Sequence, residues 1–554
     1  MSLLEAFAEI LEPADVHVAQ RLTALAGEPD ASVELAVALA VRALRGGSVC
    51  VDLRSVAGQV ELPDLPWPDP DAWLAALAAS PLLGAPPVLR LFGDLLYLDR
   101  YWLEEQQVCD DVLALVSVRP GGAVPDVSRL FGAGFEEQRE AAKVALSQGL
   151  TVLTGGPGTG KTTTVARLLA LLAEQAALAG KPSPRIALAA PTGKAAARLQ
   201  EAVQLEIDQL DLVDRRRLTG LQATTLHRLL GPRPDTSSRF RHHRANRLPH
   251  DVIVVDETSM VSLTMMARLL EAVRPQTRLV LVGDPDQLAS VEAGAVLADL
   301  VEGLGSRGVA ELKTSHRFGE SIGALASAIR TGDADAALAV LAAGGEHIEW
   351  VHEDPVEQLR EVVVPHAMRL RQAAILGDQR EALATLDEHR LLCAHRRGPA
   401  GVDHWNRQVQ RWLGEETGEP LWGSWYVGRP ILVTANDYGL KLYNGDTGVV
   451  VATPDGMRAV IGDAGTFATG RLTDVETMHA MTIHKSQGSQ ADEVTVLLPS
   501  EDSRLLTREL FYTAVTRAKT RVRVVGAEAE VRAAIERQAV RATGLRKRLR
   551  PAGV

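Results

Sequence analysis

The feature that most constrains this chain is the glycine-rich run GGPGTGKT at Gly155–Thr162. It follows an apolar segment with strand character, Thr151–Leu153, and precedes a helical segment, Thr163–Ala177, which is the context that a phosphate loop requires. The glycines let backbone N–H groups wrap around phosphates, and the helix N-terminus adds a favourable dipole. Lys161 is expected to reach the β- and γ-phosphates and the Thr162 hydroxyl to bind Mg²⁺, so the pattern predicts an ATP site. The residues that this pattern assigns to the nucleotide are Gly155, Gly156, Pro157, Gly158, Thr159, Gly160, Lys161, Thr162 and Thr163.

Two carboxylates and a glutamine follow further apolar strands. Val252–Val255 leads directly into Asp256 and Glu257. Asp256 suits the carboxylate that holds Mg²⁺ through water, and Glu257 suits the base that orients the attacking water. An Asp-Glu pair is otherwise most often a solvated turn, but its position after a buried strand favours the functional interpretation. A second strand, Leu279–Val282, is followed by Gln287, which is placed to sense the γ-phosphate.

The chain beyond the phosphate loop alternates short β-branched runs with helical segments. This alternation predicts an α/β fold with parallel sheets and helices on both faces. The expected strands are Leu150–Leu153, Ile186–Ala189, Val252–Val255 and Leu279–Val282 in a first series, and Leu391–Ala394, Val494–Leu498 and Val522–Val525 in a second. The segment 422–470 is rich in glycine and short alternating strands, and it predicts a small inserted β-domain.

The N-terminal quarter differs in both pattern and charge. Apolar residues recur at helical spacing in Leu3–Leu11, Val16–Leu25 and Ala31–Leu44, and a further helical stretch is expected over Leu95–Leu115. Residues 1–130 contain 19 Asp or Glu, 8 Arg and no Lys, whereas the rest of the chain has equal numbers of acidic and basic residues. Such an acidic segment would repel DNA. We therefore expect it to contact protein, with a solvated acidic face kept for solubility as the alternative.

The remaining bulk properties limit the class of protein. The three cysteines, Cys50, Cys109 and Cys393, show no paired ligand spacing, so neither a disulfide framework nor a zinc site is indicated. No long uncharged apolar run occurs and the N-terminus is acidic, so we expect a cytoplasmic protein that does not enter a membrane. The expected domains are residues 1–120 (acidic and helical), 127–310 (with the phosphate loop), 311–421 together with 471–554, and the insertion at 422–470.

Nine short motifs occur in an order that few ATPases share. They are Gln138, GGPGTGKT at 155–162, APTGKAAARL at 190–199, TTLH at 224–227, DETSM at 256–260, GDPDQL at 283–288, HRF at 316–318, TIHKSQG at 482–488 and YTAVTRAK at 512–519. This series resembles the ordered motif set of superfamily 1 DNA helicases. Within them, the run at 287–300 and LYNGDTG at 442–448 are similar to the RecD group, and DVHVAQRL at 15–22 resembles the RecD (alpha) subunit of the RecBCD exonuclease, exodeoxyribonuclease V.

The resemblance implies a fold and roles for single residues. The fold is a pair of tandem RecA-like P-loop motor domains with a helical N-terminal domain and a small β-barrel inserted in the second motor domain. Gln138 is expected to read the adenine edge. Arg317 and Arg517 match the arginines that the second motor domain presents to the γ-phosphate, a task that suits a planar and permanently charged guanidinium.

The resemblance also assigns a track for single-stranded DNA. Small hydroxyls and occasional cations grip phosphates without reading sequence, although each threonine taken singly fits a helix cap as well. The residues assigned to this track are Pro191, Thr192, Lys194, Thr224, His227, Thr482, His484 and Ser486. In the inserted barrel, Tyr438, Lys441 and Tyr443 are candidate DNA contacts. The basic run Arg239–Arg247 fits either a contact with DNA or a partner, or a solvated face.

These observations favour one function and leave alternatives. We expect an ATP- and Mg²⁺-dependent 5′–3′ DNA helicase that acts as a subunit with RecB-like and RecC-like partners on double-strand DNA ends, its polarity implied by the resemblance alone. No clustered nuclease carboxylates are evident apart from the ATP site, so nuclease activity is expected in a partner. The alternatives are a stand-alone RecD-like helicase and a regulatory subunit that binds nucleotide without hydrolysing it.

Overall fold

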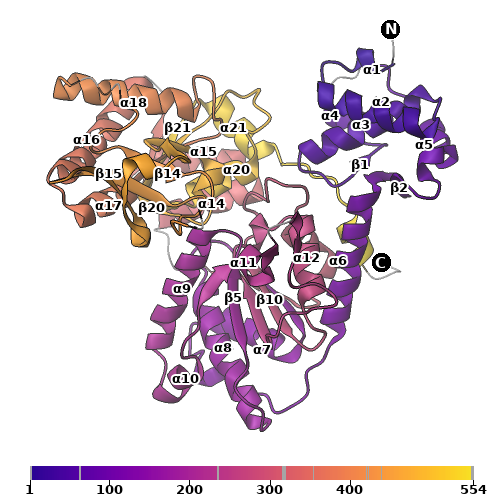
Figure 1. Ribbon diagram of the computed structural model, residues 1–554, viewed down its shortest axis with the longest axis horizontal. Coiled ribbons are helices and arrows are strands. Elements are labelled where there is room, and N and C mark those ends of the chain that lie inside the picture. The colour runs from indigo at the N-terminus through magenta and orange to yellow at the C-terminus, as the bar shows by residue number, and fades with distance from the viewer. Residues whose placement is uncertain are drawn as a thin grey trace.

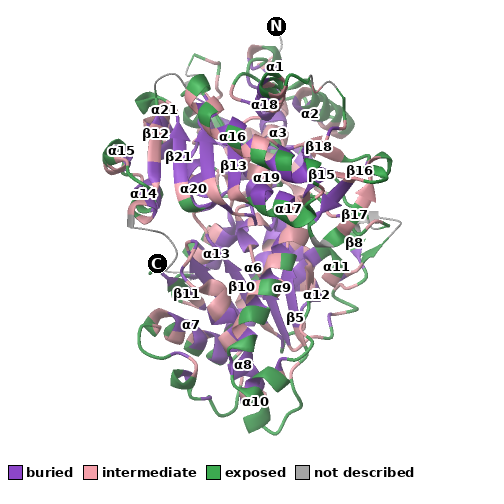
Figure 2. Cartoon of the chain, turned by 90° about the vertical axis from the view of Figure 1, so that its left-hand side faces the viewer, coloured by how far each residue is buried: buried purple, intermediate pink, exposed green. Residues whose placement is uncertain are grey.

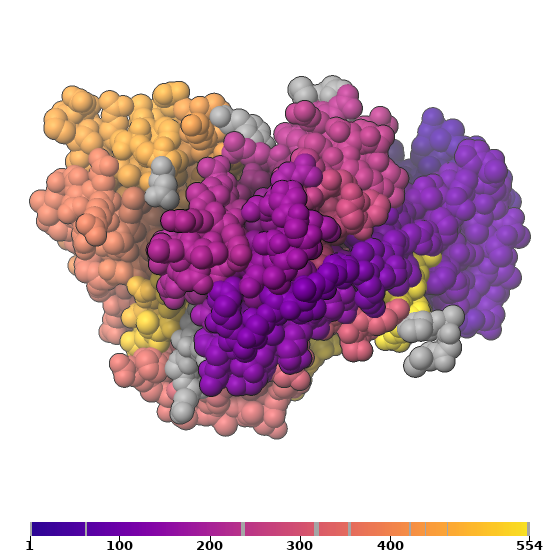
Figure 3. Space-filling model, turned by 90° about the horizontal axis from the view of Figure 1, so that it is seen from below, coloured from indigo at the N-terminus to yellow at the C-terminus, as the bar shows by residue number. Residues whose placement is uncertain are grey.

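A computed structural model describes residues 3–60, 64–233, 236–314, 320–352, 355–419, 421, 423–437 and 439–550. Figure 1 shows three bodies: an N-terminal lobe, a first motor domain in the centre and a second motor domain on the other side. Seen from below in Figure 3, the N-terminal lobe and the second motor domain lie at opposite ends of the molecule. The lobe is therefore placed to contact other molecules without covering the cleft between the motor domains.

The N-terminal lobe combines helices with a small antiparallel sheet. Its elements are α1 (Leu3–Ala6), α2 (Pro13–Ala26), α3 (Ala31–Arg45), β1 (Val51–Asp52), α4 (Val56–Val60), α5 (Pro70–Ala79), β2 (Leu89–Phe92) and β3 (Leu95–Leu98). The expected helix over Leu95–Leu115 is wrong at its start, because Leu95–Leu98 pairs with β2 in a hairpin and with β1 on its other side. The helix expected over Leu3–Leu11 ends at Ala6.

Helix α6 (Asp99–Ser117) joins the lobe to the first motor domain. It packs along α12 (Leu263–Ala272), and its residues Val108 and Val112 are buried in the same core as the central strands of that domain. The expected boundary at residue 120 therefore does not separate two independent packing units, because α6 covers one face of the first parallel sheet.

The first motor domain has a six-stranded parallel sheet. In spatial order its strands are β11 (Val309–Leu312), β4 (Leu150–Gly155), β10 (Arg278–Gly283), β9 (Val252–Val255), β5 (Ile186–Ala190) and β6 (Ala223–Thr225). Its other helices are α7 (Glu136–Ser147), α8 (Lys161–Leu178), α9 (Gly193–Asp208), α10 (Leu212–Arg217), α11 (Leu226–Leu230) and α13 (Val296–Leu304). The four predicted strands are confirmed. The expected boundary at 310/311 falls inside β11, which pairs with β4, so this domain extends at least to Leu312.

The side chains of this sheet alternate between two cores, as the two-residue period of a strand requires. In β9, Val252 and Val254 face the core built with α7, α8 and α9, whereas Ile253 and Val255 face the core built with α6, α12 and α13. Figure 2 shows the strands of both parallel sheets as buried, with exposed residues gathered on the outer helices. The expected doubly covered parallel sheet is therefore confirmed.

The second motor domain repeats this plan with a five-stranded parallel sheet. In spatial order its strands are β12 (Ile348–Val351), β21 (Ala518–Val525), β20 (Ala491–Leu497), β13 (His389–Cys393) and β19 (Ala480–Thr482). Its helices are α14 (Glu320–Thr331), α15 (Ala334–Ala343), α16 (Pro355–Ile375), α17 (Gln379–Glu388), α18 (Val402–Thr417), α19 (Ile483–Ser486), α20 (Arg508–Val515) and α21 (Glu528–Glu536). The three strands expected here are confirmed.

The insertion in the second motor domain is an antiparallel sheet. In spatial order its strands are β17 (Gly465–Ala468), β16 (Gly456–Ile461), β15 (Thr447–Thr453), β14 (Pro430–Val433) and β18 (Val475–Thr477). Among the described residues, the two edge strands β17 and β18 do not pair with each other. The sheet also continues beyond the expected end at 470, because β18 adds a strand on the far side of β14.

The last described segment leaves the second motor domain. After α21 the chain crosses back to the first motor domain, where α22 (Leu545–Leu549) packs against α13 and α6. Figure 1 shows this segment running from the second motor domain to the base of the N-terminal lobe. The expected assignment of 471–554 to the second motor domain is therefore wrong for this segment. Among the described residues, no helix combines the length and apolar character needed to cross a membrane.

Candidate ATP cleft and nucleic-acid groove

The phosphate loop connects β4 to α8, as its sequence pattern predicts. Gly158 and Gly160 both have φ of +82°, in the left-handed region that favours glycine. A Cβ on Gly155 would lie 2.6 Å from the carbonyl oxygen of Leu312, so this position also excludes a side chain. Lys161 begins α8, and its Nζ donates to the carbonyl oxygens of Gly155 at 2.6 Å and Gly156 at 2.9 Å. The amine therefore lies over the loop, where a phosphate would be held.

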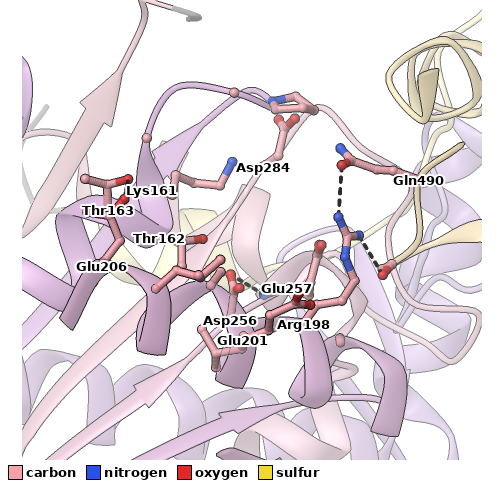
Figure 4. Close-up of a pocket in the computed structure, with 18 of the residues that line it drawn as sticks. Lys161, Thr162, Thr163, Arg198, Glu201, Glu206, Asp256, Glu257, Asp284 and Gln490 are labelled. Carbon is pink, nitrogen blue, oxygen red and sulfur yellow. Dashed lines mark hydrogen bonds between the residues drawn. The ribbon is translucent and has the colours of Figure 1, made fainter. Parts of the chain in front are cut away.

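A cavity of about 800 Å³ opens beside this loop, between the two motor domains. Figure 4 shows Lys161, Thr162 and Thr163 along one wall and Asp256, Glu257 and Arg198 along another. The residues of the sequence prediction that line the cavity are Gln138, Pro157, Gly158, Gly160, Lys161, Thr162, Thr163, Asp256, Glu257, Gln287 and Arg517. The chain thus brings residues from both motor domains around one cavity.

One end of the cavity has the composition of a site for a planar base. Gln138 is buried on α7, and its Nε2 donates to the carbonyl oxygen of Thr159 at 3.2 Å. Beside it, the guanidinium of Arg167 lies 4.7 Å from the ring centroid of Phe135, and both side chains line the cavity. The sequence prediction missed Phe135 and Arg167. The only signal for them was the aromatic residue that precedes Gln138 by three positions.

Acidic side chains, among them Asp256, Glu257 and Asp284, also line the cavity. Burial raises the pKa of Asp256, and the charge of Glu257 raises this pKa further, whereas Lys161 and Arg198 lower it. Asp284 is also buried, and burial raises its pKa against the opposing charge of Lys161. Glu257 has φ of +50°, one of two positive values outside glycine among the described residues. Such backbone conformations are most often retained where function requires them.

The second motor domain reaches the cavity through Arg517. This residue is buried, and its Nη2 donates to Oε1 of Gln287 in the first motor domain at 2.9 Å. Nearby, the Tyr512 hydroxyl donates to Oδ2 of Asp284 at 3.1 Å, and Gln287 Nε2 donates to the same oxygen at 3.0 Å. Gln287 and Arg517 therefore belong to one hydrogen-bonded group across the cleft. Asp284 and Tyr512 lay within the quoted motifs, but no role was predicted for them.

A second arginine crosses the cleft in the opposite direction. Arg198, on α9 of the first motor domain, donates from Nη1 to the carbonyl oxygen of Gly488 at 2.8 Å and from Nη2 to Oε1 of Gln490 at 2.9 Å. Figure 4 shows both hydrogen bonds.

The sequence prediction missed Arg198 and Gln490. The predicted Arg317 and the candidate DNA contact Tyr438 both lie outside the described residues.

A second cavity, of about 820 Å³, lies between the first motor domain and the inserted sheet. Four predicted DNA residues line it from the first motor domain, namely Pro191, Thr192, Thr224 and His227. Lys441 and Tyr443 line it from the insertion, together with Asn436 and Asn444. Among the described residues, the buried hydroxyl of Thr224 has no hydrogen-bond partner. This groove thus presents cations, amides and an aromatic ring to a ligand.

The other predicted DNA residues are placed differently. Lys194 is half-buried and lies near the charges of Arg390, Asp387 and Asp446 rather than in the groove. Thr482 caps α19 by accepting from the Lys485 N–H, as the helix-cap alternative predicted.

The last two residues of this prediction lie in α19. Ser486 is buried, and its hydroxyl donates to the Ile483 carbonyl oxygen, so it offers no free surface for DNA. His484 is half-buried, and burial lowers the pKa of its imidazole, with the charge of Arg541 lowering it further.

Two arginines of the basic run Arg239–Arg247 are engaged in contacts within the protein. The run begins at the end of β8 (Thr236–Phe240), which pairs with β7 (Pro232–Arg233) in a short hairpin. Arg244 forms an ion pair of 2.6 Å with Asp111 on α6, and Arg247 donates to the carbonyl oxygen of Val273. These contacts fix the hairpin to the first motor domain.

Comparison with known proteins gives matches along most of the chain. The AAA domain family matches residues 135–353, and the UvrD-like helicase C-terminal domain matches 477–525. The family described as the N-terminal domain of the RecBCD enzyme subunit RecD matches 8–97. The chain is 99% identical over 554 residues to the RecBCD enzyme subunit RecD of Mycolicibacterium smegmatis, covering 100% of both proteins.

The chain belongs to the RecD family of RecBCD enzyme subunits. It is also 71% identical to a RecD subunit of Mycobacterium tuberculosis, over 99% of this chain and 96% of that protein. A more distant relative, the ATP-dependent RecD2 DNA helicase of Deinococcus radiodurans, is 32% identical over 75% of this chain and 52% of that protein. As a member of the RecD family, with AAA and helicase C-terminal domains, the chain is a nucleotide-binding DNA helicase.

Proposed function

We propose that this RecD chain hydrolyses ATP in the cleft between its motor domains and uses the opening and closing of that cleft to move along single-stranded DNA in the 5′–3′ direction. The observation that supports this proposal most strongly is the Arg517–Gln287 hydrogen bond, because it joins the second motor domain to the first inside the cavity of the phosphate loop. A permanently charged guanidinium there can stabilise the charge of the transferring phosphoryl group. The polarity is carried over from the family.

The roles of the cavity residues follow from their chemistry. Lys161 would hold the β- and γ-phosphates, and Glu257 would orient the attacking water. Thr162 and Asp256 line the cavity together and offer hydroxyl and carboxylate oxygens, the donors that Mg²⁺ takes alongside substrate phosphates. Bound there, the ion would neutralise charge that develops on the phosphate oxygens. Gln138 would contact the adenine.

We further propose that the chain works in the cytoplasm within a RecBCD-type assembly that processes double-strand DNA ends. The N-terminal lobe, acidic and projecting away from the second motor domain, would bind the RecB-like or RecC-like partner, and a partner would supply nuclease activity. The stand-alone alternative is weaker, because the RecD2 relative matches at much lower identity than the RecD subunits do.

The deciding experiment measures ATP hydrolysis by the full-length protein, with its partners where they co-purify, in the absence and presence of oligo(dT). We expect DNA to stimulate hydrolysis, and Lys161→Gln to abolish the stimulated rate. Strand displacement on duplexes with a 5′ or a 3′ tail tests polarity, and only the 5′-tailed duplex should be unwound. A wild-type rate no higher than that of Lys161→Gln would contradict the motor function.

A further inference from the structure

Helix α9 separates the two cavities of the motor. Residues Gly193, Ala196, Ala197 and Gln200 of α9 line the nucleic-acid groove, at helical spacing along one face. A second stripe on another face lines the ATP cavity, and it consists of Ala195, Arg198, Leu199, Glu201, Ala202, Leu205 and Glu206. A change at either cavity therefore acts on the same helix.

Arg198 is the residue of the second stripe that holds the other motor domain. Its guanidinium binds the carbonyl oxygen of Gly488 and the side chain of Gln490, both of which also line the ATP cavity. Gly488 has φ of +71°, and a Cβ there would lie 3.4 Å from Cβ of Ala195, so the loop rests directly on α9. Two acceptors held by one planar guanidinium fix both the position and the orientation of this loop.

The loop held by Arg198 continues from the predicted DNA motif. Its segment 482–490 begins with Thr482 and His484 and ends at Gln490. In the same segment, Gln487 Nε2 donates to the carbonyl oxygen of Leu288, next to Gln287 of the ATP cavity. The segment thus contacts both α9, whose other face lines the nucleic-acid groove, and the strand-end residues that face the nucleotide.

We propose that Arg198 is the positioning residue that couples nucleotide occupancy to nucleic-acid affinity, an inference that rests on the proposed motor function. Both acceptors of Arg198 are neutral groups, whereas a triphosphate in the same cavity offers anionic oxygens that form stronger, charge-assisted hydrogen bonds with guanidinium. Nucleotide binding therefore draws Arg198 away from Gly488 and Gln490. The segment 482–490 is released from α9, and the position of α9, whose other face lines the nucleic-acid groove, changes with the nucleotide state.

The test compares the dissociation constant of a fluorescent oligo(dT), measured by anisotropy, with and without a non-hydrolysable ATP analogue and Mg²⁺. The ratio of the two constants is the coupling factor, and thermodynamic reciprocity requires the same ratio for nucleotide affinity with and without DNA. We expect a wild-type factor of about 5- to 150-fold, the usual range for coupled sites. In Arg198→Ala it should fall to within about twofold of unity.

Three further variants separate coupling from simple loss of structure. Arg198→Lys keeps the charge but lacks the planar fork, so it should also lose the coupling. Gln490→Ala removes one of the two acceptors and should lower the factor partly, with no additional loss when combined with Arg198→Ala. Gln204→Ala, an exposed residue on the same helix, is the matched control and should keep the wild-type factor.

A wild-type coupling factor in Arg198→Ala, or in Gln490→Ala if the arginine variant does not fold, would overturn the inference. A wild-type protein that shows neither DNA binding nor DNA-stimulated hydrolysis would instead overturn the proposed function, before any variant is compared.

Discussion

Arg517, just beyond the end of α20, donates a hydrogen bond from its Nη2 to Oε1 of Gln287 in the first motor domain at 2.9 Å. Within the second motor domain, Nε of Arg517 also donates a hydrogen bond to the carbonyl oxygen of Thr513 at 3.1 Å. The guanidinium is therefore fixed in the cleft by both motor domains, and separating the domains must remove it from the ATP cavity. In the proposed function, phosphoryl transfer would therefore depend on cleft closure.

Replacing Arg517 by alanine should lower kcat for ATP hydrolysis on the order of 10³-fold, because a charge that stabilises the transition state is lost. The KM for ATP should change much less, since Lys161 and the phosphate loop still bind the ground state. Steady-state ATPase measurements with saturating oligo(dT) check both values. Arg532→Ala, at an exposed ion pair on α21, serves as the control. Equal loss in both variants would exclude a specific role for Arg517.

The left-handed backbone of Glu257 gives two separable predictions. Glu257→Gln should lower single-turnover hydrolysis by about 10²- to 10⁴-fold while nucleotide binding is retained, because the base that orients water is removed.

Glu257→Gly should lose the same activity but raise the free energy of unfolding by about 1 kcal/mol relative to Glu257→Gln, because glycine adopts φ of +50° without steric cost. Thermal melts of the two variants check this difference. A glycine variant that melts below the glutamine variant would show that this backbone is not strained.

If a DNA phosphate reaches Lys194, whose neighbours Thr192 and Gly193 line the groove, the affinity for DNA should depend on pH. Burial lowers the pKa of its amine to about 8, with Arg390 contributing, so the free protein loses this charge between pH 7 and pH 9. A bound phosphate favours the charged amine, so affinity is full below the free-state pKa and falls as pH rises through it. We expect oligo(dT) affinity to fall about tenfold from pH 7 to pH 9, which corresponds to one pKa unit. Anisotropy titrations at both values measure it.

The matched variant for this prediction is Lys194→Arg, because arginine stays charged over the whole range. Its oligo(dT) affinity should be the same at pH 7 and pH 9. An equal pH dependence in the variant and the wild type would assign the effect to another group and remove Lys194 from the DNA track.

The sequence predicted those parts of the fold that depend on short-range pattern. Val252–Val255 could be recognised because four consecutive β-branched residues suit a strand that is buried on both faces. Leu95–Leu98 was misread as helix, since its apolar run does not distinguish the two structures. The missed signal was the pair Gly93-Asp94 between two apolar runs, which forms the turn of the β2–β3 hairpin, with Gly93 at φ of +60°.

The parts of the site that escaped prediction depend on contacts between distant segments. Arg198 is one arginine on an amphipathic helix, and its partners Gly488 and Gln490 lie 290 and 292 positions further along the chain. Arg198 lies within the quoted motif APTGKAAARL, but the motif does not show that its guanidinium reaches across the cleft rather than into solvent. The phosphate loop needs no such information, because its glycines, lysine and following helix are contiguous.

The C-terminal segment supplies the last prediction, through the buried ion pair of Arg548 and Glu105. The pair measures 2.9 Å, with side chains 8% and 0% exposed, and the Arg548 guanidinium also lies 4.1 Å from the ring centroid of Phe92. Arg548→Ala would leave Glu105 buried without its cation. We expect a loss of about 3–5 kcal/mol in the stability of the N-terminal lobe and its junction with α6, seen as a lower midpoint of thermal unfolding.

Two comparison variants decide whether this loss comes from the unpaired charge. Lys547→Ala changes an exposed neighbour on the same short helix, and its midpoint should stay at the wild-type value. Combining Arg548→Met with Glu105→Gln removes both charges and should recover part of the stability that Arg548→Ala loses, because no charge is then left buried alone. If Arg548→Ala unfolded at the same temperature as Lys547→Ala, the C-terminal segment with α22 would not stabilise the N-terminal lobe.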